Sequence, residues 1–263
     1  GQGSVTAEGL RDPLLGPLAR LAGGASGATT YAAQLGWRGG APEWQVSSSL
    51  QGLALALPAP LGKRAETTLP LRAEQAVQVL VGSQAQTDRL QVTLGPAAAP
   101  LLDARWEREL GERGARVLRG VVALGVEPAE APAWPGEGVV AAARLAELDV
   151  DAWERALVGA GVGAGAALGG PEAAGGEYLP TRLSLELQQL RVVGRRFERV
   201  LAGLSREAGV WRANVEAPEL SGYLELRPGQ SGAAGSIYAR LARLNLATEA
   251  GREGTAMRTW VPS

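Results

Sequence analysis

The stretch WQVSSSLQGLALALPAPLGK (residues 44–63) decides the fold. In it, Leu53, Leu55 and Leu57 alternate with alanines. An apolar period of two predicts a β-strand with one apolar face. The prolines that follow Leu57 end the strand, because proline has no N–H to donate to a sheet ladder.

The same alternation recurs along most of the chain and predicts a mainly β protein. Closely spaced strands separated by Gly and Pro turn signals favour antiparallel meanders. In the later part, the apolar phase slips between Leu187 and Leu190. A bulge near Gln188 and Gln189 would explain that slip. The expected strands are 2–8, 30–37, 44–57, 68–81, 88–94, 102–110, 116–124, 138–145, 183–192, 195–204, 211–217, 220–226 and 236–246.

Two short amphipathic helices interrupt the predicted strands. The first is expected near residues 12–22, where an Asp-Pro pair supplies an N-cap and a first helical position. The second is expected near 150–158, where Asp151-x-x-Glu154 resembles a capping box. We assign Asp149 and Asp151 to helix capping rather than to catalysis, because a helix N-terminus favours acidic side chains.

A Gly/Ala-rich segment divides the chain. Residues 159–177 contain many glycines, which suggests a phosphate loop. Such a loop follows a strand and ends in GK[S/T], and this segment has neither feature. We interpret this segment as a linker or loop. The predicted organisation is therefore a first β-groove unit over 1–158 and a second over 178–263.

The composition excludes several classes of function. The chain has no cysteine and no histidine, so thiol nucleophiles, His-dependent triads and ordinary zinc sites are excluded. We predict no catalytic residue, no metal site and no cofactor, and therefore no enzyme. With 26 basic and 27 acidic residues, the chain has no basic footprint for nucleic acid.

The strands themselves carry the functional prediction. Several have Leu or Val on one face and charged or polar residues on the other, so the sheet must cover its apolar face. A monomer rarely exposes more than a few hundred Å² of contiguous apolar surface. A sheet that curls into an open trough therefore implies a ligand, and acyl chains suit it. The predicted groove residues are Leu53, Leu55, Leu57, Leu183, Leu185, Leu187, Val215 and Leu241.

Several segments resemble the YhdP family of AsmA-like proteins. They are WQVSSSLQGLALALPAPLGK, LPLRAE, DRLQVTLG, GVVAAARLAELDVDAW, WRANVEAPELSGYLEL and YARLARLNL, and they cover nearly the whole chain in order. The segments LPAPLGK and LDVDAW are the most specific of them. The Trp and Leu-x-Gly strand pattern is common to many β proteins.

The resemblance implies an internal or C-terminal segment of a long periplasmic protein. Such proteins are anchored in the inner membrane by a segment that lies outside this chain, and no run of 18 apolar residues occurs here. Their repeated β-groove units form an apolar channel that binds phospholipid and conducts it between the inner and outer membranes in outer-membrane biogenesis. The implied partners are phospholipid, neighbouring groove repeats of the same chain, and membrane or envelope proteins at the two ends.

A second hypothesis stays open at the level of sequence. The apolar faces of two sheets can cover each other in a closed β-sandwich. The chain would then be a binding module of the cell envelope for glycan or protein adhesion. It would carry no lipid and would use exposed tryptophans for recognition.

Overall fold

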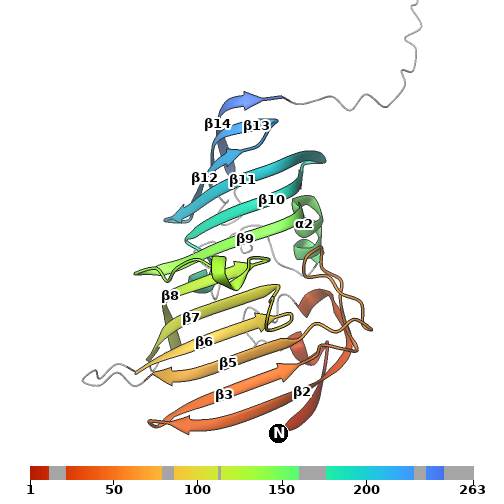
Figure 1. The fold of residues 1–263 in the computed structure, drawn as a ribbon, viewed down its shortest axis with the longest axis vertical. Coiled ribbons are helices and arrows are strands. Elements are labelled where there is room, and N and C mark those ends of the chain that lie inside the picture. Colours follow the sequence, from red (N-terminus) through yellow and green to blue (C-terminus); the bar gives the residue numbers. More distant parts are fainter. Residues whose placement is uncertain (12–21, 79–85, 112–113, 160–175, 228–234, 246–263) are drawn as a thin grey trace, which may run out of the picture.

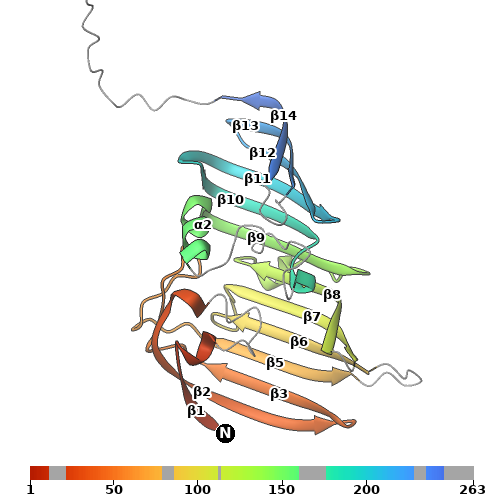
Figure 2. The same ribbon diagram turned by 180° about the vertical axis from the view of Figure 1, so that it is seen from behind.

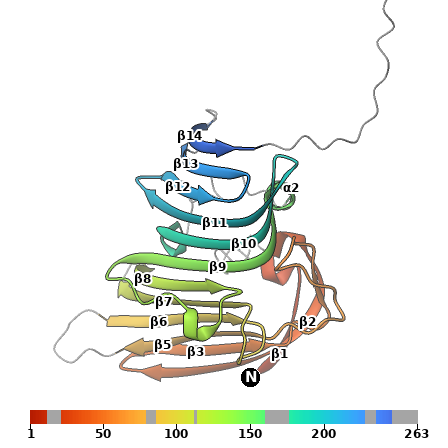
Figure 3. The ribbon, with the colours of Figure 1, turned by 45° about the horizontal axis from the view of Figure 1, so that its top comes forward.

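One open, curved sheet of fourteen strands forms the body of the protein (Figure 1). The structure is a computed structural model, and it describes residues 1–11, 22–78, 86–111, 114–159, 176–227 and 235–245. The strands are stacked along the long axis of the molecule, and β1 and β14 lie at opposite ends of the stack (Figure 3). The predicted mainly β fold and open sheet are confirmed.

The strands follow one another in the sheet in the order of the sequence, except that β4 pairs with β2 beside the main path. Their bounds are β1 Gln2–Thr6, β2 Ala25–Arg38, β3 Ala41–Ser48, β4 Leu53–Leu55, β5 Leu71–Gln78, β6 Gln86–Leu94, β7 Leu102–Gly111, β8 Gly114–Leu124, β9 Gly138–Asp149, β10 Arg182–Val192, β11 Arg195–Glu207, β12 Val210–Glu216, β13 Leu220–Arg227 and β14 Ser236–Leu244. The helical elements are η1 Gly9–Arg11, η3 Ala22–Gly24, η4 Pro128–Glu130, α2 Val150–Gly159 and η5 Gly176–Tyr178.

The sheet is not antiparallel throughout. Strand β9 runs parallel to both β8 and β10, whereas the other neighbouring strands are antiparallel. The prediction of uninterrupted antiparallel meanders was therefore wrong at these two pairs. An apolar period of two shows on which face of the sheet each side chain lies. It does not show whether neighbouring strands run parallel or antiparallel. The helix predicted near 12–22 lies almost entirely outside the described residues.

The two connections around β9 cross opposite faces of the sheet. The first, residues 125–137, contains η4, and Glu130 in it pairs with Arg144. The second contains α2 and η5, and Tyr178 in η5 bonds to Arg108. Figure 1 views the sheet from the side of η4, and Figure 2 views it from the opposite side.

The phase slip after Leu187 is shared by three neighbouring strands. Leu187 pairs with Val200 and Leu190 pairs with Phe197, without a shift in register between β10 and β11. Strand β9 keeps its register with β10 over the same stretch. The predicted bulge in β10 alone was therefore wrong. At this irregularity the backbone of Arg199 in β11 adopts a left-handed conformation, with φ 49°.

A side wall, formed by residues 49–67 and α2, lies along one side of the sheet (Figure 2). The stretch 44–57, predicted as one or two strands, contains two, β3 and β4, separated by a turn at residues 49–52. Trp153 of α2 donates a hydrogen bond to the carbonyl of Ala59 at 3.1 Å. The two segments most specific to the family resemblance, LPAPLGK and LDVDAW, thus contact each other across the side wall.

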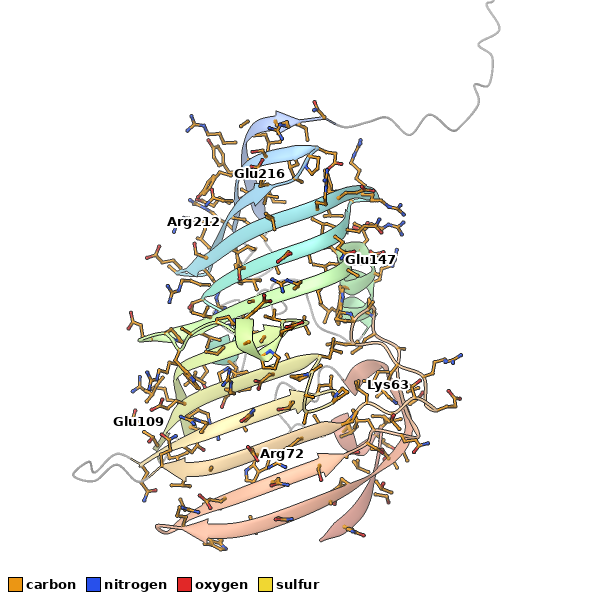
Figure 4. All side chains as sticks on the ribbon, viewed as in Figure 1. Lys63, Arg72, Glu109, Glu147, Arg212 and Glu216 are labelled. Carbon is orange, nitrogen blue, oxygen red and sulfur yellow. The ribbon has the colours of Figure 1, made fainter. Side chains whose placement is uncertain are left out.

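The only lysine of the chain lies inside this wall (Figure 4). The Nζ of Lys63 donates to the carbonyls of Leu50, Leu53 and Arg64 at 2.8, 2.5 and 3.0 Å. Burial lowers its pKa, although nearby Glu66 opposes the shift. An ammonium has three donors on one atom, and three converging carbonyls satisfy all of them. A planar guanidinium does not match that arrangement.

The N-terminus of α2 differs from the predicted capping box. Asp149, and not Asp151, is the cap, and it accepts a hydrogen bond from the backbone N–H of Ala152 at 2.7 Å. The carboxylate of Asp151 instead accepts the N–H groups of Val193 and Gly194, both at 2.7 Å. Asp151 therefore attaches the β10–β11 hairpin to the side wall.

The backbone ladder continues across the predicted domain boundary. Strands β9 and β10 are neighbours in one sheet, although residues 160–175 between them lie outside the described part. The division into groove units over 1–158 and 178–263 stays a prediction.

We predict that Lys63→Met lowers the free energy of unfolding by about 2 kcal/mol, because the half-buried carbonyls of Leu50 and Leu53 lose a charged donor. Lys63→Arg should recover only part of this loss. Urea unfolding measures both variants, with Arg64→Met, an exposed neighbour, as the control. Equal stability of wild type and Lys63→Met would contradict the role given to the ammonium.

We also predict that the hairpin attachment is lost in acid. Hydrogen bonds from Gly194 and Val193 lower the pKa of Asp151 from its ordinary 3.8. The attachment is present above that value and is lost as pH falls through the lower, folded-state pKa. The amide NMR shifts of Val193 and Gly194 should titrate together with a midpoint below 3.8. Asp151→Asn should remove this titration, and amide shifts that ignore pH in the wild type would refute the contact.

Candidate functional site

The strand register places apolar side chains in a row across the sheet. Paired residues on neighbouring strands point to the same face, so the register can be followed from strand to strand. Starting from Ala33 in β2, one partner after another is Ala, Val or Leu up to Ala239 in β14. We call this set row A. Its members are Ala33, Val46, Ala73, Val92, Ala104, Val122, Ala141, Leu183, Leu204, Ala213, Leu224 and Ala239.

A second row lies beside row A on the same face. In each strand from β5 onward on the main path, its member is two residues away from the member of row A. Row B begins at Leu71 in β5 and is apolar or glycine throughout. Its members are Leu71, Leu94, Leu102, Leu124, Ala143, Leu185, Ala202, Val215, Gly222 and Leu241. We call the face that carries rows A and B the apolar face, and the opposite one the polar face. With strands about 4.8 Å apart, row A is about 50 Å long.

Five of the eight predicted groove residues lie on this face. Leu183 belongs to row A, and Leu185, Val215 and Leu241 belong to row B. Leu187 follows Leu185 on the same face and is buried in a cluster with Phe197 and Val200. The lipid contact predicted for them stays a prediction.

The other three predicted residues lie in the side wall. Leu53 is only 2% exposed and packs with Ala7, Ala25 and Leu50. Leu55 packs against the same cluster, and Leu57 follows β4. Because β4 pairs with the start of β2 and leaves the main path, these leucines are not members of the rows themselves. The cluster around Leu53 nevertheless packs against Leu71 and Leu94, the first two members of row B.

A buried ion pair interrupts the apolar character of this face. Asp88 is 0% exposed, and its carboxylate accepts two hydrogen bonds from Arg108, at 2.9 and 2.6 Å. Arg108 also donates to the hydroxyl of Tyr178 at 3.1 Å. Burial opposes the charge on Arg108, but the hydrogen bonds to Asp88 and Tyr178 outweigh it and raise its pKa. The network fixes η5 to the sheet.

Trp106 reinforces this attachment. Its ring lies over Gly120 of β8, where an added Cβ would be 2.5 Å from the ring. Its indole N–H donates to the carbonyl of Tyr178, and the two rings meet edge to face at 5.6 Å. A side chain larger than hydrogen at Gly120 would displace Trp106 and, with it, η5.

Ion pairs cover the polar face. Arg119 pairs with Glu107 and Arg144 with Glu186 across neighbouring strands, and Arg72 pairs with Glu74 within β5. A hollow of about 1000 Å³ lies over β2 to β7 on this face. On its floor, Gln91 donates to Asp103 at 3.1 Å. Two smaller hollows lie over β9 to β12.

The sequence contains a signal for the Asp88–Arg108 pair that our predictions did not use. Asp88 has the same parity as Leu90, Val92 and Leu94, so it lies on the apolar face of β6. Arg108 likewise follows the parity of Trp106 in β7. A single acid and a single base in the apolar phase of adjacent strands predict a buried ion pair.

The comparisons with known proteins give one match. The family model described as YhdP protein matches residues 1–260. The searches of curated proteins and of solved structures returned no match. Within the described ranges, no helix is both long enough and apolar enough to cross a bilayer.

We predict that Arg108→Met lowers the free energy of unfolding by about 3–5 kcal/mol, because it leaves the Asp88 carboxylate buried without its cation. The double variant Asp88→Leu/Arg108→Met should recover most of this loss. Arg116→Met, which breaks the exposed pair with Glu109, should cost less than about 1 kcal/mol. Urea unfolding tests all three, and a double variant no more stable than Arg108→Met would contradict a coupled pair.

Proposed function

Because the chain belongs to the YhdP family, we propose that it binds phospholipid acyl chains along rows A and B and conducts lipid between the inner and outer membranes. Membership suggests an AsmA-like lipid-transport protein of the cell envelope, in a family not known for enzymes. We propose a periplasmic location, with the inner-membrane anchor in a segment outside this chain. Neighbouring groove repeats of the same longer protein would continue the apolar face.

The observation that carries the proposal is the continuity of row A. Every strand from β2 to β14 on the main path contributes an Ala, Val or Leu to it. An acyl chain requires no specific polar partner. At about 0.8 kcal/mol per buried CH₂, a chain of ~16 carbons gains about 12 kcal/mol before the costs of ordering it. A lipid can therefore bind anywhere along such a row and move along it between similar sites.

The open sheet argues against a closed sandwich. The described strands all belong to one sheet, so in this part of the chain no second layer of strands packs on rows A and B. Several row residues, such as Leu183 and Leu224, are only partly buried, and Leu241 at the edge is 38% exposed. The adhesion-type sandwich, which we considered from the sequence, is therefore not the architecture of the described residues.

The test is native mass spectrometry of the 263-residue chain purified from a Gram-negative host, with extraction of bound lipid. We expect phospholipid at near-stoichiometric amounts. Leu183→Glu should lower the retained lipid measurably, because a carboxylate in row A excludes acyl chains from the stretch of the row around β10. A wild-type protein that is folded and free of lipid would refute the proposal.

The matched control is Leu201→Glu. Leu201 lies on the neighbouring strand β11, but it points to the polar face and is 53% exposed. This variant should retain lipid as the wild type does. Urea unfolding of both variants separates loss of lipid from loss of fold. Equal lipid content in Leu183→Glu and Leu201→Glu would also contradict the proposal.

A further inference from the structure

The apolar face has a third row of side chains, which differs in character from rows A and B. Row C lies two residues from row A on the side away from row B, and it runs from Leu35 in β2 to Ile237 in β14. It contains Trp44, Trp106 and Trp211, whereas rows A and B contain no tryptophan. We call row C, together with the strand ends beyond it, the tryptophan rim.

Polar groups accompany the tryptophans at this rim. The indole N–H of Trp44 donates to the side-chain oxygen of Gln75, its neighbour in row C, at 2.6 Å. The guanidinium of Arg206 lies over the ring of Trp211, its neighbour in the same row, at 5.7 Å. The buried ion pair of β6 and β7 lies just beyond row C, toward the ends of these strands. The rim is therefore amphipathic.

The other side of the face, beyond row B, is apolar from β5 onward. Leu71 and Leu94 of row B pack against the side-wall cluster around Leu53. Over β10 and β11, Leu187 and Phe197 continue the apolar surface beyond row B. The face thus changes across its width, from apolar at the side wall to amphipathic at the tryptophan rim.

The width of the face matches the length of an acyl chain. In β13, Leu226 belongs to row C and Leu220 lies beyond row B on the same face. Six residues of strand separate them, which is about 20 Å. One leaflet supplies half of a bilayer core of ~30 Å, so its acyl chains span about 15 Å. A chain that begins at row C and lies across the strands therefore ends beyond row B.

We propose that a phospholipid on the apolar face lies across the strands, with its headgroup at the tryptophan rim and its chain ends beyond row B. The inference rests on the proposed function and adds the orientation of the lipid to it. Tryptophan suits the level between headgroup and chain, because its ring is apolar and its N–H is polar. Arg206 adds a positive charge at the rim, which favours the lipid phosphate.

The rim is accessible toward both ends of the stack of strands. Leu35 and Trp37 of β2 are 70% and 71% exposed, and Ile237 of β14 is 73% exposed. Between these ends η5 lies over the rim, where Trp106 and Arg206 donate to its carbonyls. In the described part of the chain, a headgroup thus has access to the rim over β2 and β3 and over β12 to β14.

The β10–β11 hairpin is the alternative place for a headgroup. Arg195 and Arg196 are exposed near its tip, at the opposite end of β11 from Arg206. A lipid with its phosphate at this tip would direct its chain ends to the tryptophan rim. They would then cover the guanidinium of Arg206 with methyl groups, and a charge is costly to bury against such groups. The orientation with the headgroup at the rim avoids this cost.

The test uses the absence of cysteine from the chain. Leu226→Cys and Leu220→Cys each introduce one thiol, which is labelled with bimane. Each protein is loaded with phosphatidylcholine that carries a nitroxide either on the choline or near the end of an acyl chain. We expect the headgroup nitroxide to quench position 226 more strongly than the chain-end nitroxide does. The order should be reversed at position 220.

A second pair of positions repeats the test where labelling disturbs no packing. Ile237 and Leu244 of β14 are the register partners of Leu226 and Leu220, and both are exposed. Ile237→Cys should behave as Leu226→Cys does, and Leu244→Cys as Leu220→Cys does. The control is Leu201→Cys on the polar face, where neither nitroxide should quench the label. Circular dichroism and native mass spectrometry check that each labelled protein is folded and loaded.

The outcomes separate this inference from the proposed function. With lipid bound, the reversed order of quenching in these pairs would place the headgroup at the other side and overturn the orientation. Equal quenching by both nitroxides at every position on the apolar face would also overturn it. A folded protein that takes up no phospholipid would refute the proposed function, and the orientation with it.

Discussion

The structure depends on the continuity of the strand register. Because side chains alternate with a period of two, a slip of one residue between two strands would move every later apolar side chain to the other face. From β2 to β14 the pairing keeps Ala, Val and Leu in row A. Even the irregular stretch after Leu187 preserves the pairing, because β9, β10 and β11 change phase together. Polar and apolar residues are therefore separated over the whole length of the sheet.

That separation gives the two faces different chemistry. The apolar face is continuous, and charged side chains that the structure describes on it are held beneath η5: Asp88 and Arg108 satisfy each other and Tyr178, and Arg206 donates to the carbonyl of Gly176. The polar face carries arginine–carboxylate pairs such as Arg119 with Glu107 and Arg144 with Glu186. A single layer of strands thus presents a non-specific apolar surface on one side and specific polar groups on the other.

The sequence predicted the parts of this fold that depend on side-chain parity. Strand positions followed from alternation, and so did the shared face of Leu183, Leu185, Leu187, Val215 and Leu241. Strand direction could not be predicted, because parity is the same in parallel and antiparallel pairs, and so β9 was missed as a parallel strand. The strand pairing of Leu53 could not be predicted either, because its alternation with Ala54 does not show that β4 leaves the main path. Its true partner is Gly27 at the start of β2, a long-range pairing that no local pattern contains. The contact of Asp151 with the β10–β11 hairpin was missed for the same reason. Its carboxylate accepts hydrogen bonds from a hairpin more than forty residues away in the sequence.

The parallel pairing of β9 has a consequence for folding. Strands β1 to β8 and β10 to β14 are connected mainly by short turns, so each set forms through contacts that are close in sequence. Strand β9 pairs with its two neighbours only after both long connections have closed, which costs more chain entropy before any contact compensates for it. We therefore expect the two sets to form early and independently, with insertion of β9 as the slow step that joins rows A and B into one surface. A chain arrested before this step would expose two separate apolar sheets, each with an unpaired edge at the centre of the final structure.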